Sequence, residues 1–148
     1  MTYRTWIGAA MAVILVPLVA LAHEGATGIV KERMDAMEAM GRELNAIRRS
    51  IDANRNLASI AQRAEIIRRT GERLPELFPP NSLNPPTGAK PAIWQEWDRF
   101  QSLALQLREV SGALVSAAKA GDPNAVSARY RDLVAACLSC HQDFTSTR

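Results

Sequence analysis

Cysteine and histidine are scarce in this chain, which has two residues of each among 148. Both cysteines and one histidine lie close together near the C-terminus, as Cys137, Cys140 and His141. A structural zinc site needs four ligands, so these three residues are too few for one. A thioredoxin-like cysteine pair belongs to a βαβ unit, and no useful length of the chain alternates polar and apolar residues as a strand would. A disulfide between the two cysteines would leave the neighbouring histidine unexplained.

The chain also lacks a strong excess of charge of one sign and a long apolar run after residue 22. The formal net charge is +3, and acidic and basic residues are interleaved, as on the solvated faces of helices. This charge is too small to predict binding to nucleic acid. No constellation of acid, base and nucleophile stands out, and we therefore predict that the protein is not an enzyme.

The beginning of the chain reads as an export signal. Arg4 precedes an apolar run from Trp6 to Val19, and Ala20-Leu21-Ala22 forms an A-x-A cleavage site. The run is shorter than the roughly 20 apolar residues that a membrane-spanning helix needs. We therefore predict that residues 1–22 are a cleaved signal peptide. Residues 23–148 should then form one domain in the periplasm, without a membrane span.

Glycine and proline divide the mature chain into four segments in which apolar residues recur at alternating steps of three and four, as in amphipathic helices. The segments run from Val30 to Ile51, Leu57 to Phe78, Ile93 to Ala118 and Val126 to Phe144. Five prolines within residues 79–91 prevent a continuous helix there. We predict an all-α fold, an antiparallel four-helix bundle, with this stretch packed against it as a crossover.

The spacing Cys137-Leu138-Ser139-Cys140-His141 is the pattern of c-type haem attachment. Each thiol adds across one haem vinyl group to form a thioether. Residues three apart lie on the same face of a helix, so both sulfurs can reach one edge of the macrocycle. His141 follows directly and can turn under the iron as the proximal ligand. We therefore predict one haem c, bound covalently by Cys137 and Cys140, with His141 as an iron ligand.

The motif lies in the last helical segment, and this position is similar to that in a known family of c-type cytochromes. A four-helix bundle with a C-terminal Cys-x-x-Cys-His resembles the cytochrome c′ family, also called the class II c-type cytochromes. The stretches ERMDAMEAMG, LPELFP and AIWQEW are similar to family stretches and occur in the same order. The first of them matches the family's pattern of arginine, distal residue and glycine at steps of four, here Arg33, Met37 and Gly41.

The resemblance implies two possible functions, which differ at the sixth coordination position of the iron. In one branch of the family the distal residue is usually apolar or aromatic, and the iron is five-coordinate and high-spin. In the other branch a methionine of the first helix binds the iron, which is then six-coordinate and low-spin. Met37 at the distal position favours the second branch. We expect a one-electron carrier with Met37 and His141 as axial ligands, and a five-coordinate protein that binds nitric oxide or other small gases is the alternative.

Spacing alone does not select Met37 from Met34 and Met40, because methionines at helical spacing also pack in cores. His23, at the predicted mature N-terminus, is a rival sixth ligand in principle. Arg33 is either a solvated surface residue or, as the family pattern implies, a partner for a haem propionate. We expect Tyr130 to touch the haem. The expected partners are redox proteins, and the expected oligomeric state is a monomer or a homodimer.

Overall fold

The structure of the protein, a computed structural model, describes residues 25–53 and 56–146. The predicted signal peptide and His23 lie outside these residues. The helices are α1 (Gly28–Asp52), α2 (Leu57–Arg73), the short 3₁₀ helix η2 (Leu74–Leu77), α3 (Ala92–Gln95), α4 (Trp97–Ala120) and α5 (Pro123–Phe144). The described residues contain one isolated β-bridge and no strand. The predicted all-α bundle of four long helices is therefore confirmed.

Two of the predicted helical segments are interrupted near the proline-rich crossover. The α-helical part of the second segment ends at Arg73 and continues as η2, which has Pro75 in its first turn. A proline lacks the amide hydrogen that a continuing α-helix needs. The third segment divides at Glu96, whose φ of −121° and ψ of 46° are not helical, so that α3 precedes α4.

The ends of the long helices follow from local side-chain chemistry. Asn56 precedes α2, and its side-chain oxygen accepts a hydrogen bond of 3.0 Å from the backbone N–H of Ser59. Asp122 caps α5 in the same way, and Pro123 occupies the first helical position, where no intrahelical N–H is needed. Gly121 ends α4 with a φ of +78°, a conformation that glycine adopts without steric cost.

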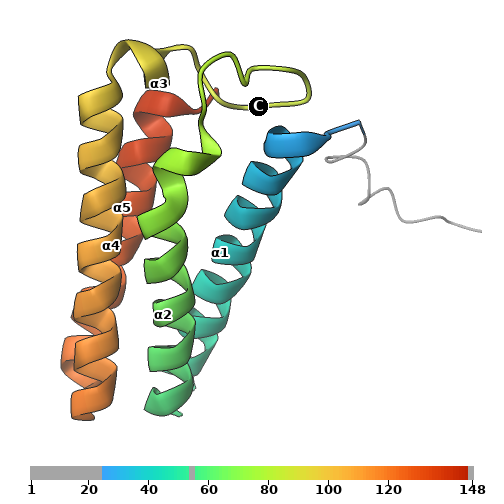
Figure 1. Ribbon diagram of the computed structural model, residues 1–148. Helices are drawn as coiled ribbons and strands as arrows, with labels where there is room; N and C mark the ends of the chain where they lie inside the picture. The colour runs from blue at the N-terminus through green and yellow to red at the C-terminus, as the bar shows by residue number, and fades with distance from the viewer. Residues whose placement is uncertain (1–24, 54–55, 147–148) are drawn as a thin grey trace, which may run out of the picture.

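The long helices contact one another unequally. α2 packs along both α1 and α4, and α4 packs along α5, whereas α1 and α5 touch only over a short stretch. Figure 1 shows α1 leaning away from the other long helices toward its N-terminal end. Gly71 allows the close approach of α2 to α4, because a Cβ atom placed there would lie 3.3 Å from the Leu107 side chain. The bundle therefore closes tightly at α2–α4 and opens between α1 and α5.

Aromatic side chains fill the end of the bundle next to the crossover. Phe100 is 2% exposed and lies at the centre of this cluster. Its ring centroid is 4.8 Å from that of Phe78, 5.6 Å from that of Phe144 and 5.3 Å from that of Trp97. The indole N–H of Trp94 donates a hydrogen bond to the Phe78 carbonyl, which attaches this side chain to the cluster. The aromatic residues at the start of the third segment thus pack in the bundle.

The proline-rich crossover packs against both α1 and the end of α5. Ser82 and Thr87 accept hydrogen bonds from α1, and the Lys90 amide donates to the Phe144 carbonyl over 3.0 Å. Ala89 and Thr145 form the isolated antiparallel bridge. The stretch is therefore an ordered part of the bundle end. Among the helices of the described residues, none has the length and apolar character needed to cross a membrane.

Candidate haem site

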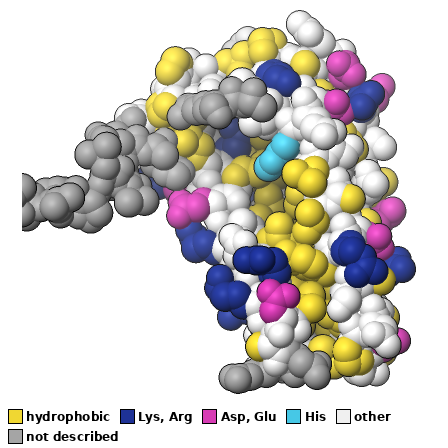
Figure 2. Space-filling model, turned by 180° about the vertical axis from the view of Figure 1, so that it is seen from behind, with side chains coloured by type: hydrophobic (Ala, Val, Ile, Leu, Met, Phe, Trp, Pro, Cys, Tyr) yellow, Lys and Arg dark blue, Asp and Glu magenta, His cyan; other side chains and the backbone are white. Residues whose placement is uncertain are grey.

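The opening between α1 and α5 contains two adjoining hollows of about 400 Å³ and about 120 Å³. Four residues line both of them: Met37, Leu74, Cys140 and His141. Most of the other lining side chains are apolar. Figure 2 shows hydrophobic side chains gathered in a band on the face opposite to that of Figure 1, with lysine and arginine on both sides of the band. The bundle thus offers an apolar space, open to one side, beside the Cys-x-x-Cys-His motif.

The two cysteines lie three residues apart on α5, and both are half-buried and unpaired. Burial raises the pKa of the Cys137 thiol, and burial, with a smaller contribution from neighbouring groups, raises that of Cys140 to about 11. Both groups are therefore neutral thiols at neutral pH. No group of three or more potential metal-ligating side chains occurs within the described part of the chain.

His141 stands in the last turn of α5 and lines both hollows. His141 is exposed. Because it follows Cys140 directly, a macrocycle attached to the two sulfurs would bring its iron next to this imidazole. Two thiols, an adjacent imidazole and an apolar hollow together fit a covalently bound haem.

The three methionines of α1 take different places around the site. Met37 lines both hollows, whereas Met34 lines only the larger one and Met40 only the smaller one. All three positions lie on a helix that faces α5 across the opening. The structure therefore separates Met37 from its two neighbours, which the spacing in the sequence does not do.

Arg33 is buried in the wall of the larger hollow, with 3% of its surface exposed. Its guanidinium donates to the carbonyl oxygen of Ser82 over 3.0 Å, to the Ser82 hydroxyl over 3.3 Å and to the Thr87 hydroxyl over 2.8 Å. Burial lowers the pKa of this guanidinium. The hydrogen-bond partners that the described residues give it, Ser82 and Thr87, are neutral. The alternative of a solvated surface arginine is therefore wrong.

Sequence reasoning missed the part of the site that the crossover and the C-terminus provide. Thr87, Gly88, Ala89 and Thr145 line the larger hollow. Irregular segments carry no periodic pattern, so no signal in the sequence pointed to these residues. Tyr130, which we expected to touch the haem, packs against the core but lines neither hollow.

Comparisons with known proteins agree with this geometry. A family model described as Cytochrome C′ matches residues 28–145. A cytochrome c′ of Rhodospirillum rubrum is 31% identical to this chain, over 95% of this chain and 97% of that protein. A cytochrome c-556 of Agrobacterium tumefaciens is 29% identical, over 79% of this chain and 96% of that protein.

Solved structures show the same fold. The crystal structure of cytochrome c′ from Thermochromatium tepidum has a TM-score of 0.75 and 24% sequence identity, over 80% of this chain and 95% of that one. Cytochrome c′ from Rhodopseudomonas palustris has a TM-score of 0.75 and 25% identity, over 83% of this chain and 99% of that one. The prediction of a covalently bound haem c is supported by the family and by the spacing of the two cysteines. With the family match over most of its length and a relative above 30% identity, the chain belongs to the cytochrome c′ family.

Proposed function

We propose that this chain is a periplasmic haem c protein whose iron leaves its distal side open to nitric oxide or another small gas. The observation that carries this proposal is the match along nearly the whole chain to a protein named cytochrome c′. A solved variant of cytochrome c prime from Alcaligenes xylosoxidans, 22% identical and with a TM-score of 0.73, is described as a nitric oxide complex. The comparisons thus favour the gas-binding alternative over the electron carrier that the sequence led us to expect.

The residues of the site take distinct roles in this proposal. Cys137 and Cys140 hold the haem through thioethers, and His141 binds the iron from the α5 side. Haem supplies an iron that can bind a diatomic gas or exchange one electron. Apolar side chains of α1 on the opposite side exclude water and charged ligands, which favours small neutral molecules. The buried positive charge of Arg33 in the wall of the larger hollow is suited to a haem propionate.

A second candidate function rests on the placement of Met37. Among the three methionines of α1, it is the one that lines both hollows together with His141. A thioether is a neutral axial ligand that raises the reduction potential of c-type cytochromes. Coordination by Met37 would close the distal side and make the protein an electron carrier for redox partner proteins.

Optical spectra of the purified haem protein decide between the two functions. A five-coordinate protein has a high-spin ferric spectrum and, once reduced, binds carbon monoxide or nitric oxide readily. A low-spin ferric spectrum that resists both gases would contradict the gas-binding function and establish the electron carrier. The cleaved signal peptide, the periplasmic location and a monomeric or homodimeric state remain part of the proposal.

A further inference from the structure

The last turn of α5, which carries His141, has an unusual set of hydrogen-bond donors. The final four carbonyl groups of an α-helix have no partner within the helix. Here the His141 carbonyl accepts from the Thr145 amide over 3.1 Å. The ammonium of Lys90 donates to the carbonyls of Gln142 and Asp143 over 3.1 and 3.2 Å, and the Lys90 amide donates to that of Phe144. A single residue of the crossover therefore serves three of these four carbonyls.

The crossover holds Lys90 in this place from both sides. Before it, the Gly88 carbonyl accepts from the Ser146 amide over 2.8 Å, and Ala89 bridges to Thr145. After it, Pro91 has a fixed φ and begins the turn into α3. The Lys90 carbonyl also accepts from the Ile93 amide over 3.2 Å. The lysine backbone is thus anchored independently of its side chain.

The positive charge of Lys90 is not neutralised by a nearby acid of the described residues. Its ammonium is in no ion pair there and contacts only backbone carbonyls. Asp143, whose carbonyl Lys90 binds, has its carboxylate paired with Arg99 over 2.5 Å. A cation at a helix C-terminus is stabilising because the helix dipole is negative there. The charge therefore stays beside the turn that presents His141.

We propose that Lys90 is a positioning residue for His141, holding the last turn of α5 through its ammonium and placing one positive charge beside the proximal side of the haem. This inference rests on the proposed role of His141 as the iron ligand. A helical last turn fixes the direction in which the imidazole points. The nearby positive charge disfavours the more positive ferric state, and so raises the reduction potential.

The test compares the haem proteins of Lys90→Met and Lys90→Arg with the unchanged chain. In all three proteins the backbone N–H of residue 90 can donate its hydrogen bond to the Phe144 carbonyl. The substitutions therefore remove or exchange only the ammonium group. Lys119→Met is the matched control, since Lys119 is an exposed lysine in the last turn of α4. Three quantities are measured: hydrogen exchange of the Thr145 amide, the reduction potential, and the hyperfine-shifted NMR signals of the His141 ring.

For Lys90→Met we expect exchange at Thr145 to be about tenfold faster, from the loss of two charge-assisted hydrogen bonds. We also expect a lower reduction potential and displaced His141 signals. Lys90→Arg should restore all three quantities, and Lys119→Met should change none of them.

Faster exchange in Lys90→Met with an unchanged potential and unchanged His141 signals would show a purely structural role and overturn the inference. If Lys90→Met left all three quantities as they are in the unmodified protein, the inference would be overturned as well. If the unmodified protein showed no hyperfine-shifted His141 signals, the proposed role of His141 would fail and this inference would fall with it. A failure of the His141 proposal can be distinguished from a failure of the Lys90 inference alone, because it is seen in the unmodified protein before any substitution is made.

Discussion

The guanidinium of Arg33 lies over the ring of Phe78, with its Cζ atom 4.7 Å from the ring centroid. This contact joins α1 to the residue that follows η2, and Phe78 in turn packs edge-on against Phe100. The same guanidinium binds Ser82 and Thr87 of the crossover. One buried cation thus connects α1, the aromatic cluster and the proline-rich crossover.

Arg33→Met should weaken the attachment of the crossover to α1. Methionine retains much of the apolar stem but donates no hydrogen bond, so the buried Ser82 loses its arginine donor and the Thr87 hydroxyl keeps the Ala89 amide as a donor. We expect a loss of about 2 kcal/mol in the free energy of unfolding and faster hydrogen exchange in residues 79–91. Urea denaturation and amide exchange measure the two effects.

Arg42→Met is the control for this change, because Arg42 is an exposed arginine of α1 that pairs with Glu38 one turn away. Such surface pairs contribute about 0.3–0.5 kcal/mol. Equal losses in the two variants would contradict the connecting role of Arg33.

Met37→Ala tests the distal side of the iron. If the iron is five-coordinate, the ferric protein should stay high-spin, and reduced protein should bind carbon monoxide faster because the side chain that lines both hollows is shorter. Visible spectra and flash photolysis follow both properties. Met40→Ala, which changes only the smaller hollow, should have a smaller effect on gas binding. Conversion of a low-spin into a high-spin spectrum by Met37→Ala would instead establish Met37 as a ligand.

Expression together with haem-maturation machinery should yield residues 23–148 carrying one covalently bound haem, which mass spectrometry can detect. The double variant Cys137→Ala, Cys140→Ala should lose the covalent link and melt at a lower temperature. The reason is an apolar space left unfilled, where even one buried Leu→Ala change costs about 2–5 kcal/mol. Leu138→Ala, in the exposed position between the cysteines, should keep the haem. A mature chain without added mass would end the haem proposal.

Gly71→Ala should destabilise the contact between α2 and α4. The added Cβ would lie 3.3 Å from the Leu107 side chain and 3.4 Å from the backbone nitrogen of Arg108, and a helix backbone cannot easily move away. We expect a loss of about 1–2 kcal/mol by thermal or urea denaturation. Gly112→Ala has room for its Cβ, with the nearest atom at 3.7 Å, and should gain about 0.5–1 kcal/mol. If both variants gained stability, the close approach of α2 to α4 would leave room for a Cβ atom at position 71, and the prediction would be wrong.

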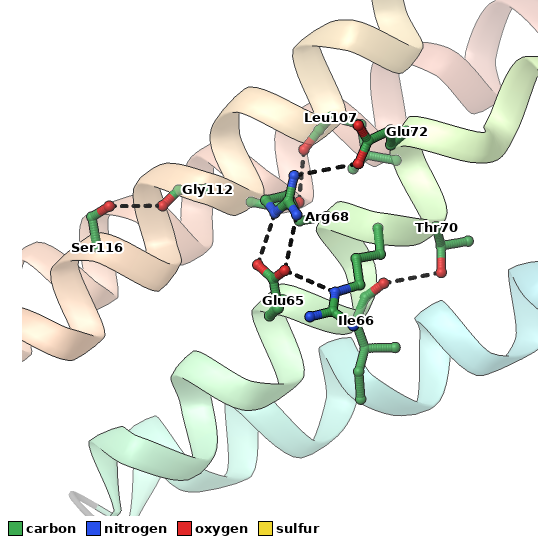
Figure 3. Close-up of polar contacts among 10 residues, drawn as sticks. Glu65, Ile66, Arg68, Thr70, Glu72, Leu107, Gly112 and Ser116 are labelled. Atoms are coloured by element: carbon green, nitrogen blue, oxygen red, sulfur yellow. Dashed lines mark hydrogen bonds and ion pairs between the residues drawn. The ribbon is translucent and has the colours of Figure 1, made fainter.

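Glu65 should make the free energy of unfolding depend on pH at values below 4.5, the ordinary pKa of a glutamate side chain. Its carboxylate accepts hydrogen bonds from Arg68 over 2.7 and 2.9 Å and from Arg69 over 2.9 Å, as Figure 3 shows for the Arg68 pair. These bonds lower its pKa to about 2. The stabilisation is therefore present above pH 4.5 and is lost as the pH falls toward about 2.

The corresponding experiment measures urea denaturation of the unchanged chain and of Glu65→Gln at several pH values between 7 and 2. The difference in the free energy of unfolding should shrink as the pH falls, because the unchanged chain loses its carboxylate pairing. Glu109→Gln, at an exposed position of α4, should show a smaller dependence. A difference that is constant with pH would contradict the pairing.

The haem-attachment motif and the four long helices could be predicted from the sequence because both depend on local spacing. The two thiols and the imidazole of the Cys-x-x-Cys-His motif lie within five consecutive residues, Cys137 to His141, so the motif can be recognised without knowledge of the fold. The apolar stripes recur every three or four residues, which is a property of each helix alone. The breaks at Arg73 and Glu96 were missed, because the apolar pattern continues across both.

The partners of Arg33 and Lys90 were decided by the tertiary structure alone. Arg33 and Ser82 are 49 residues apart, and Lys90 and Asp143 are 53 apart. Whether such residues meet depends on the path of the crossover, and an irregular, proline-rich segment has no period from which that path can be inferred. The sequence by itself therefore determined the helices and the covalent attachment of the cofactor. Only the packing of the crossover decided that Arg33 is buried in the wall of the larger hollow and that Lys90 binds the carbonyl groups at the end of α5.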